Sequence, residues 1–451
     1  MEKRENIREL VTDMVTEITA GREKSHILIR NVLDKYSYLP GHDRNFIKKV
    51  TEGTIERLVT IDYVLNSFSK VPVNKMKPFI RSLMRMSVYQ ILFLDKVPES
   101  AACNEAVKLA QKRGFGQLKA FVNGVLRSVV RNKDTVVFPD KKKDFIKYLS
   151  VIYSMPESVV TLLISQYGAE TAEAILNGYL LERPVCVRIS QNIPAIEKDK
   201  VLRNWTALGI EARKHPWLDY AYELYQAGSM RDDENFIAGL YTVQDVSSML
   251  IGEIAGIHRD DYIVDVCSAP GGKALHACDK LAGTGCVDAR DVSDYKTGLI
   301  LENRERMRAD NLTVKVWDAR IKDGEVEGKA DVVLLDIPCS GLGVIGRKPE
   351  IKYRLDEASF AELDALQKEI ADAVVGYVKQ GGTLIYSTCT LRKEENEQMV
   401  SYITENFGFT TESLNPYLPA DLHNADTGKG YLTLLPTDKS DGFFMARLKK
   451  N

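Results

Sequence analysis

The sequence predicts a multidomain protein: an all-α N-terminal bundle, a small α+β middle module, and a C-terminal α/β domain with a doubly wound, mostly parallel sheet. Its 451 residues exceed the roughly 250–300 over which a single hydrophobic core extends. Apolar residues recur at helical spacing near the N-terminus, whereas after Asp261 short apolar runs alternate with helical segments. We place the boundaries at residues 1–140, 141–235 and 236–451.

The N-terminal part, from Ile7 to about Arg131, has the three- and four-residue apolar spacing of amphipathic helices. From Lys70 to Lys133, thirteen lysines and arginines stand against three acids, a local charge of +10 in a chain whose net charge is −2. A basic module joined to an acidic remainder indicates that the basic module binds the phosphates of a nucleic acid while another domain carries out catalysis. The alternative is a solvated helix face without a partner.

The middle and C-terminal parts combine helices with strands. In the middle module we expect helices at Ala169–Leu181 and Val201–Leu208 around a strand at Pro184–Ile189. The C-terminal strands are expected at Tyr262–Cys267, Gly285–Asp291, Thr313–Val316, Asp331–Asp336 and Thr383–Ser387, with helices such as Lys296–Arg308 and Ala361–Val378 between them. Such sheets bind ligands at the carboxyl ends of their strands.

The composition, 44% hydrophobic and 27% charged, is that of a globular protein, and no run of about 18 apolar residues predicts a membrane span. Residues 1–5 lack the features of a secretory signal, so we expect a cytoplasmic protein with reduced cysteines and no membrane partner. The seven cysteines include no Cys-x-x-Cys pair and no His at zinc spacing, which argues against disulfides and a bound metal. We expect a monomer.

A glycine-containing turn follows the first C-terminal strand. The turn reads Cys267-Ser268-Ala269-Pro270-Gly271-Gly272-Lys273 and leads into a helix, whose N-terminus offers unpaired N–H donors. It has neither the Gly-x-Gly-x-x-Gly of a dinucleotide site nor the pattern of a phosphate loop. Asp291, about 20 residues further on, is placed to accept hydrogen bonds from a ribose, and Asp318 from an adenine amine. A nucleoside ligand is indicated, unless these acids only cap helices.

Two cysteines follow neighbouring predicted strands: Cys339 comes just after Asp336, and Cys389 comes after Thr388. The carboxyl ends of parallel strands share one edge of the sheet, so two thiols and a carboxylate should converge in one cleft. Isolated cysteines are usually inert core residues, and we assign that role to Cys103, Cys186, Cys278 and Cys286.

Three motifs, Asp-x-Cys-x-Ala-Pro-Gly-Gly-Lys, Asp-x-Pro-Cys-Ser-Gly and Ser-Thr-Cys-Thr, resemble those of the RNA cytosine-5 methyltransferases with two active-site cysteines, from about Thr242 to Leu448. The N-terminal part resembles the antitermination factor NusB, on segments such as Arg81-Ser82-Leu83-Met84-Arg85 and Phe121-Val122-Asn123-Gly124. Together they resemble the bacterial 16S ribosomal RNA cytosine-5 methyltransferases of the B type (RsmB/NOP family). The resemblance implies a NusB-like RNA-binding domain and a Rossmann-like methyltransferase domain.

The resemblance also implies a mechanism and a ligand set. Cys389 would add to carbon 6 of cytosine, and Asp336 would hold the nitrogen 3 edge. Cys339 would assist loss of the carbon 5 proton, and Lys273 would either lower a thiol pKa or bind the base. S-adenosylmethionine would be converted to S-adenosylhomocysteine while held by residues 267–273, Asp291, Asp318 and Asp336.

The sequence is also compatible with two other functions. The first is a non-catalytic RNA-binding or ribosome-assembly factor on a methyltransferase fold, against which the retained cysteines count. The second is a dehydrogenase with a reactive cysteine, which would lack its dinucleotide motif. The sequence specifies neither the target nucleotide, nor whether naked RNA or an assembly intermediate is the substrate, nor the role of the middle module.

Overall fold

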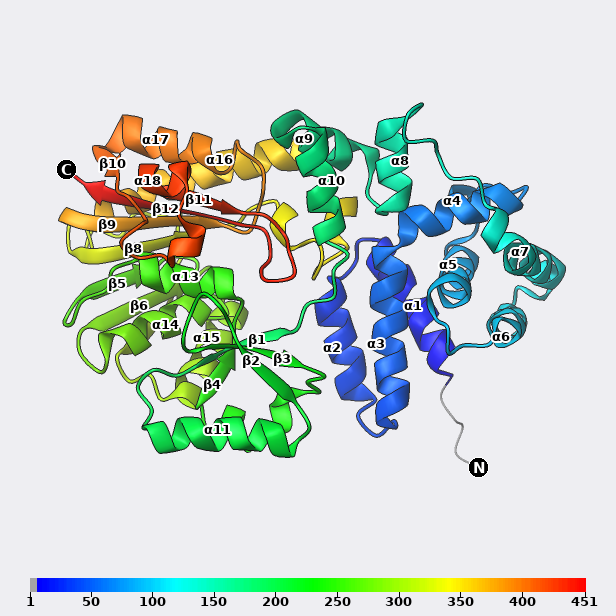
Figure 1. Cartoon of the computed structure of the whole chain (residues 1–451), viewed down its shortest axis with the longest axis horizontal. Helices are drawn as coiled ribbons and strands as arrows, with labels where there is room; N and C mark the ends of the chain where they lie inside the picture. The colour runs from blue at the N-terminus through cyan, green and yellow to red at the C-terminus, as the bar shows by residue number, and fades with distance from the viewer. Residues whose placement is uncertain (1–5) are drawn as a thin grey trace. The chain divides into compact units, whose positions relative to one another are not determined.

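The computed structural model describes residues 6–451, which form two compact units (Figure 1). The first unit runs through Leu180 and also includes Ile345–Asp356, and the second contains Leu181–Val344 and Glu357–Asn451. Residues 141–180 therefore group with the helical part of the chain. The division into three functional domains, at residues 1–140, 141–235 and 236–451, stays a prediction. Residues 1–5, on which the expected absence of a secretory signal rests, lie outside the described residues.

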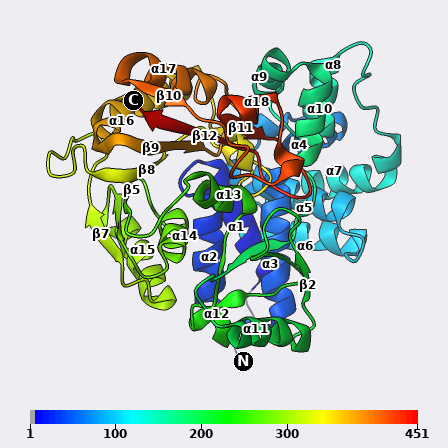
Figure 2. The same cartoon turned by 60° about the vertical axis from the view of Figure 1, so that its left-hand side comes forward.

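The first unit is all-helical, as the apolar spacing predicts (Figure 2). Its helices are α1 (Ile7–Thr19), α2 (Ser25–Lys35), α3 (Gly41–Glu56), α4 (Leu58–Phe68), α5 (Pro78–Phe93), α6 (Glu99–Lys112), α7 (Lys119–Asn132), α8 (Phe145–Ile152), α9 (Glu157–Tyr167) and α10 (Ala169–Gly178). Asn6 caps helix α1, because its side chain accepts hydrogen bonds from the Arg8 and Glu9 amides. Helix α5 begins at Pro78, and proline suits a first helical position because it has no N–H that would lack an acceptor there. Apolar faces of α1 to α7 build one core.

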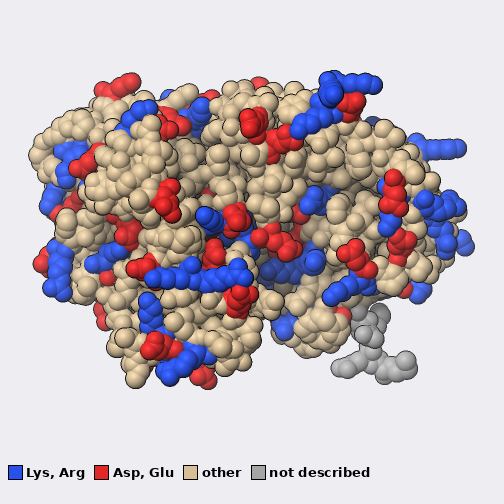
Figure 3. All heavy atoms as spheres, in the orientation of Figure 1, with Lys and Arg blue, Asp and Glu red and all other residues tan. Residues whose placement is uncertain are grey.

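Lysine and arginine side chains gather over the α7 end of this unit (Figure 3). Between α6 and α7 lies a hollow of about 510 Å³, lined by Asn104, Val107, Lys108, Lys119, Ala120, Asn123 and Arg127. Three of these seven residues are cationic and none is acidic. Three of the thirteen basic residues in the segment 70–133 thus line one concave surface.

No single helix among residues 6–451 is long and apolar enough to cross a bilayer. Helices α8 and α9 reach the required length and composition only when taken as a pair, across a bend of 116°.

A segment far along the sequence, Ile345–Asp356, is built into the first unit. Ser25 donates to the Glu350 carboxylate from its amide (3.1 Å) and its hydroxyl (2.6 Å). Lys352 Nζ donates to the Glu56 carbonyl oxygen (2.8 Å), and the Tyr353 hydroxyl donates to that of Ile55 (3.0 Å). Burial raises the pKa of Glu350, but hydrogen bonds from His26 and Ser25 outweigh it and bring the pKa to about 2. These polar contacts fix the segment against α2 and α3.

The second unit begins with a four-stranded antiparallel sheet of strand order β2-β3-β1-β4. Its elements are β1 (Val185–Ile189), α11 (Ala195–Ala207), β2 (Glu211–Lys214), β3 (Ala221–Tyr225), α12 (Glu234–Ile237) and β4 (Tyr241–Val243). Trp205 of α11 is fully buried against Tyr222 and Tyr241 of this sheet. The predicted α+β module is found in part: its strand and second helix are β1 and α11, whereas its first helix is α10 of the first unit. Strands β2, β3 and β4 were not predicted.

The rest of the second unit is a larger sheet of order β10-β12-β9-β8-β5-β6-β7, with β11 paired to β12. Its strands are β5 (Tyr262–Asp265), β6 (Cys286–Asp291), β7 (Leu312–Val316), β8 (Ala330–Asp336), β9 (Val378–Thr388), β10 (Phe409–Thr411), β11 (Tyr431–Leu434) and β12 (Phe443–Lys450). Strands β5 to β9 are mutually parallel, whereas β12 runs antiparallel to β9. All five predicted C-terminal strands are therefore confirmed.

Helices cover both faces of this sheet, which confirms the doubly wound fold (Figure 1). On one face pack α13 (Val246–Ile254), α14 (Gly272–Leu281) and α15 (Asp294–Met307), and on the other α16 (Glu357–Val374) and α17 (Glu397–Phe407). A short helix, α18 (Ala425–Lys429), precedes β11. Alternate strand residues face opposite layers, as Leu334 and Leu335 do.

Several predicted boundaries differ from the structure: the helix expected from Val201 begins at Ala195, and the helix expected to reach Leu181 ends at Gly178. The helix expected to reach Val378 ends at Val374, and β9 already begins at Val378, five residues before the predicted strand. Gly381 has φ +69° there, and the pairing of β8 with β9 shifts register between Ala330 and Val332. The irregular start of β9 breaks the alternation by which a strand is recognised.

Candidate active site

The predicted ligand loop connects β5 to α14 and is tied to the end of β6. The Ser268 amide donates to the Arg290 carbonyl oxygen (2.8 Å), and the Ala269 amide donates to the Asp291 carboxylate (2.9 Å). The Ala269–Pro270 peptide bond is cis, and Gly271 has φ +101°, which glycine adopts without strain. Helix α14 then begins at Gly272, so its N-terminal amides lie at this edge of the sheet.

Asp291 and Asp318 follow neighbouring strands, as predicted. Asp291 is buried, and it accepts hydrogen bonds from Lys296 Nζ (2.9 Å) and the Val292 amide (2.8 Å). The Trp317 amide donates to the Asp291 carbonyl oxygen, which brings the turn containing Asp318 to the same edge. The Asp318 carboxylate is bound by Arg320, whose hydrogen bonds lower its pKa. It makes no hydrogen bond to another predicted site residue.

Asp336, at the end of β8, lies between Lys273 and Ser387. One carboxylate oxygen accepts from Lys273 Nζ (2.7 Å) and the other from the Ser387 hydroxyl (2.8 Å). Burial lowers the pKa of Lys273, but the Asp336 charge and hydrogen bond outweigh it, and the net pKa is raised. Lys273 therefore stays protonated, and it also lies over the Phe443 ring.

The two predicted thiols lie together, with Sγ of Cys339 and Sγ of Cys389 3.2 Å apart. Both side chains are partly exposed, and neither is in a disulfide. The hydrogen bond with Cys389 and burial raise the pKa of Cys339 well above the usual value for a thiol. Cys339 therefore keeps its proton, and it can donate that proton to the sulfur of Cys389. Cys103, Cys186 and Cys278 are buried, as expected for core residues, but Cys286 is exposed.

Asp265 is a site residue to which the sequence analysis assigned no role. It ends β5 and is 1% exposed, yet neither carboxylate oxygen has a hydrogen-bond partner. Burial, followed by the charge of Asp336, raises its pKa to about 7. A buried, unpaired carboxyl group at the ligand edge is suited to a cationic group of a ligand. Its place as the first residue of the Asp-x-Cys-x-Ala-Pro motif was the available signal.

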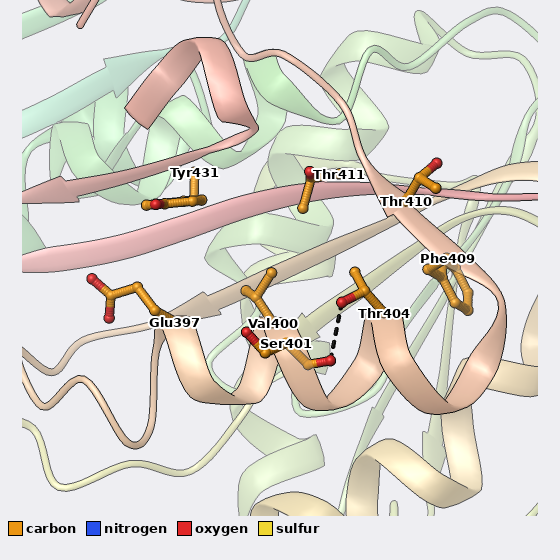
Figure 4. Close-up of a pocket in the computed structure, with 8 residues that line it drawn as sticks. All are labelled: Glu397, Val400, Ser401, Thr404, Phe409, Thr410, Thr411 and Tyr431. Atoms are coloured by element: carbon orange, nitrogen blue, oxygen red, sulfur yellow. Dashed lines mark hydrogen bonds between the residues drawn. The ribbon is translucent and has the colours of Figure 1, made fainter. Parts of the chain in front are cut away.

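Residues 6–451 contain no group of three or more His, Cys, Asp or Glu side chains arranged to hold a metal ion. A separate hollow of about 400 Å³ lies between α17, β10 and β11 (Figure 4). Its lining residues are Glu397, Val400, Ser401, Thr404, Phe409, Thr410, Thr411 and Tyr431. It contains none of the predicted site residues, so the candidate chemistry belongs to the strand ends.

Comparison with known families defines the class of protein. Residues 254–449 match the family described as 16S rRNA methyltransferase RsmB/F, and residues 5–131 match the NusB family. The larger sheet and its helices in the second unit thus belong to a methyltransferase domain, and the helices up to residue 131 belong to a NusB-type domain.

Relatives extend the match over the full chain. A protein of Bacillus subtilis (strain 168) named "Probable ribosomal RNA small subunit methyltransferase B" is 33% identical, over 99% of this chain and 99% of its own. A protein of Synechocystis sp. with the same name is 29% identical over 98% and 99%. The chain belongs to the ribosomal RNA small subunit methyltransferase B family.

Solved structures share the fold. The structure of PH0851 has a TM-score of 0.80 and 22% identity, and covers 98% of this chain and 99% of its own. The structure of NSun6 from Pyrococcus horikoshii with SFG has a TM-score of 0.57 and 20% identity, over 66% and 99%. At these identities the similarity concerns the fold alone.

Proposed function

We propose that this chain methylates carbon 5 of a specific cytosine in 16S ribosomal RNA, with S-adenosylmethionine as the methyl donor. The observation that carries the proposal is the pair of thiols 3.2 Å apart in the loops that follow β8 and β9, together with the bond between Asp336 at the end of β8 and Lys273 of α14. Carbon 5 of cytosine is a weak nucleophile, so a catalyst must first raise its electron density by adding to carbon 6. A thiol next to a proton donor provides such a nucleophile.

Cys389 is the proposed nucleophile. The proton that Cys339 retains stabilises a thiolate on Cys389 through the hydrogen bond between them. The electron pair of this thiolate would form the bond from sulfur to carbon 6, and the displaced electrons of the 5,6 double bond would make carbon 5 nucleophilic. Carbon 5 would then bond to the methyl carbon as the bond from the methyl group to the sulfonium sulfur breaks, with that electron pair staying on the sulfur of S-adenosylhomocysteine. Lys273 and Ser387 orient the carboxylate of Asp336, which would bind the nitrogen 3 edge of the base.

Cys339 acts in the release of the product. Once Cys389 is bonded to carbon, its sulfur carries no charge, and the partner that raises the pKa of Cys339 is lost. Cys339, which is partly exposed, can then release its proton to solvent, and its thiolate accepts the proton from carbon 5. The electron pair left at carbon 5 forms the 5,6 double bond, and the bond to carbon 6 breaks with its electrons returning to Cys389.

The residues at the carboxyl edge fit the proposed cofactor. S-adenosylmethionine supplies the methyl group as a sulfonium that also carries an ammonium group. Residues 267–273 present backbone at the start of α14, and Asp291 offers carboxylate oxygens suited to ribose hydroxyls. The unpartnered Asp265 would ionise beside a cationic group of the cofactor, whose charge lowers the raised pKa of this carboxyl. Asp318 would reach the adenine amine after releasing Arg320.

The function is tested by incubating the purified protein with unmethylated 16S ribosomal RNA and labelled S-adenosylmethionine. Bisulfite sequencing then maps the modified base. The assay is run with naked RNA and, separately, with assembly intermediates of the small subunit. We expect labelled methyl groups at one cytosine with at least one of these two substrates. Binding of RNA without any incorporation of label would instead support a non-catalytic assembly factor.

Asp291→Ala should weaken cofactor binding by ten- to a hundredfold. A hydrogen bond to a charged acceptor contributes about 1.5–3 kcal/mol, which corresponds to that range. Asp294→Ala, on an exposed residue three positions further on, is the matched control and should bind normally. Isothermal titration calorimetry with S-adenosylmethionine measures both. Unchanged affinity in a folded Asp291→Ala variant would reduce Asp291 to a structural residue of the loop.

The concave surface between α6 and α7 is the proposed RNA contact of the helical unit. Lys108, Lys119 and Arg127 line it together with the amide side chains of Asn104 and Asn123. Lys108 also pairs with Glu105, but at an exposed position where such a pair is weak. RNA phosphates can therefore replace this partner at little cost.

Replacing Lys108, Lys119 and Arg127 by glutamine should weaken RNA binding and make it less sensitive to salt. Loss of three phosphate contacts should reduce the slope of log affinity against log salt by roughly two to three. Lys198, Lys200 and Arg203 of α11, changed in the same way, form the matched control. Filter binding at several salt concentrations measures the slopes. Equal slopes for the two triple variants would remove this surface from the RNA interface.

A further inference from the structure

Two neighbouring polar residues, Glu395 and Asn396, are completely buried just after the strand that leads to Cys389. Each has 0% of its surface exposed, in the turn between β9 and α17. Burying such groups costs free energy unless they are hydrogen-bonded, so their partners indicate what they stabilise. The two side chains hold two different loops.

Glu395 holds the backbone around Cys339. Its Oε2 accepts a hydrogen bond from the amide of Ser340 (2.8 Å), the residue after Cys339. The same oxygen accepts from Nε2 of Gln367 (2.9 Å), a fully buried residue of α16. That Gln367 amide also donates to the carbonyl oxygen of Pro338 (3.0 Å), the residue before Cys339. The peptide groups on both sides of Cys339 are thus fixed by one pair of side chains.

Asn396 binds the residue on each side of Cys389, one through its side chain and the other through its carbonyl oxygen. Its Oδ1 accepts from the hydroxyl of Thr388 (2.6 Å), the residue before Cys389. Its Nδ2 donates to the carbonyl oxygen of Thr390 (3.1 Å), the residue after Cys389. Thr388 and Thr390 are both fully buried, so water does not compete for these bonds.

The two loops are also joined directly. The hydroxyls of Ser340 and Thr390 share a hydrogen bond (2.6 Å), and the amide of Gly343 donates to the carbonyl oxygen of Cys389 (2.9 Å). These bonds set the spacing between the loops, whereas Glu395 and Asn396 each orient one loop. Reaction rates depend steeply on such placement, since a displacement of about 1 Å can cost roughly a hundredfold.

We propose that Glu395 and Asn396 are separate positioning residues for the two thiols: Glu395, with Gln367, orients Cys339, and Asn396 orients Cys389. The assignment rests on the proposed function, in which Cys389 forms the covalent adduct and Cys339 resolves it. Loss of Asn396 therefore slows formation of the adduct, whereas loss of Glu395 slows its resolution. Residues that only stabilised the fold would not separate these two steps.

The test follows covalent protein–RNA complexes on denaturing gels, with RNA and S-adenosylmethionine, for full-length variants. Glu395→Ala should accumulate the adduct and lower turnover roughly ten- to a hundredfold, with adduct formation nearly unchanged. Asn396→Ala should slow adduct formation by a similar factor, without accumulation. Glu395→Gln keeps an acceptor oxygen and should therefore resolve the adduct nearly as the unchanged protein does. If the negative charge of Glu395 were what mattered, Glu395→Gln would instead fail as Glu395→Ala does.

A second pair of variants covers the case in which the alanine variants do not fold. Gln367→Ala removes the donor to Pro338 and should accumulate the adduct, as Glu395→Ala does. Thr388→Val removes the hydroxyl donor to Asn396 and should slow adduct formation, whereas Thr388→Ser keeps the hydroxyl and should not. If both pairs impair the same step, or neither step, the positioning roles are wrong.

Cys339→Ala and Cys389→Ala run on the same gel distinguish failure of this inference from failure of the proposed function. If those two variants separate as expected and the positioning variants do not, only the present inference is overturned. If the cysteine variants themselves do not separate, the covalent mechanism and the inference built on it both fail.

Discussion

Cys389→Ala is expected to abolish methyl transfer and to form no covalent complex with RNA. Cys339 is not expected to replace Cys389, because its sulfur lies 3.2 Å away on a different loop, where it is placed to remove the proton of carbon 5 rather than to add to carbon 6. Loss of a nucleophile that acts together with its partner groups costs of the order of 10⁴-fold or more in rate. The measurement is incorporation of labelled methyl groups, together with denaturing gel electrophoresis for the complex.

Cys339→Ala should lose turnover by a different route. Its adduct forms and is methylated but cannot readily release the carbon 5 proton, so protein crosslinked to methylated RNA should accumulate. Cys286→Ala, at an exposed cysteine on β6, is the matched control and should turn over normally. A crosslink in Cys389→Ala and none in Cys339→Ala would reverse the two roles. Normal methylation by both variants would exclude the thiol mechanism.

The second large effect concerns Lys352, which is 2% exposed in the first unit. Burial lowers its pKa from 10.5 to about 7, against the opposing charge of Glu56. In the unfolded chain the lysine keeps its proton up to pH 10.5, so between pH 7 and 10.5 the unfolded state binds more protons. Stability from this group therefore rises with pH, by about 1.4 kcal/mol per unit.

Lys352→Met should raise the free energy of unfolding at pH 7 by about 2–4 kcal/mol, because a side chain of similar length replaces a buried ammonium group. It should also remove the stability gain between pH 7 and 9. Urea denaturation followed by circular dichroism at both pH values measures this for the helical unit. Lys348→Met, on an exposed lysine of the same segment, should change neither. A less stable Lys352→Met variant would mean that the bond to the Glu56 carbonyl oxygen outweighs the burial cost.

The fold could be predicted where one local pattern dominated. Strands β5 and β8 are mostly buried runs rich in branched residues, and the helical unit repeats its apolar residues every three or four positions. Strand β2, Glu211–Lys214, is short and mostly exposed with three charged residues, so it has no alternation to detect. Its pairing with β3 supplies what its sequence does not.

The candidate site divides in the same way. The positions of Cys339 and Cys389 follow from strand ends alone, because parallel strands bring their carboxyl ends to one edge. Glu395 and Asn396 were not predictable, because they stand in the charged run Lys393-Glu394-Glu395-Asn396-Glu397, which is typical of an exposed turn. Glu395 is paired with Gln367 and Ser340, which are distant in the sequence, and Asn396 with Thr388 and Thr390. Charge by itself does not reveal such partners.

The inclusion of Ile345–Asp356 in the helical unit has a consequence for the order of synthesis. A ribosome completes residues 6–180 long before it makes Glu350, Lys352 and Tyr353, and at about 5–20 residues per second the interval is roughly 10–35 s. During that interval the Ser25 hydroxyl and the carbonyl oxygens of Ile55 and Glu56 lack their native partners. The N-terminal domain thus reaches its final form only after the loop carrying Cys339 has been translated.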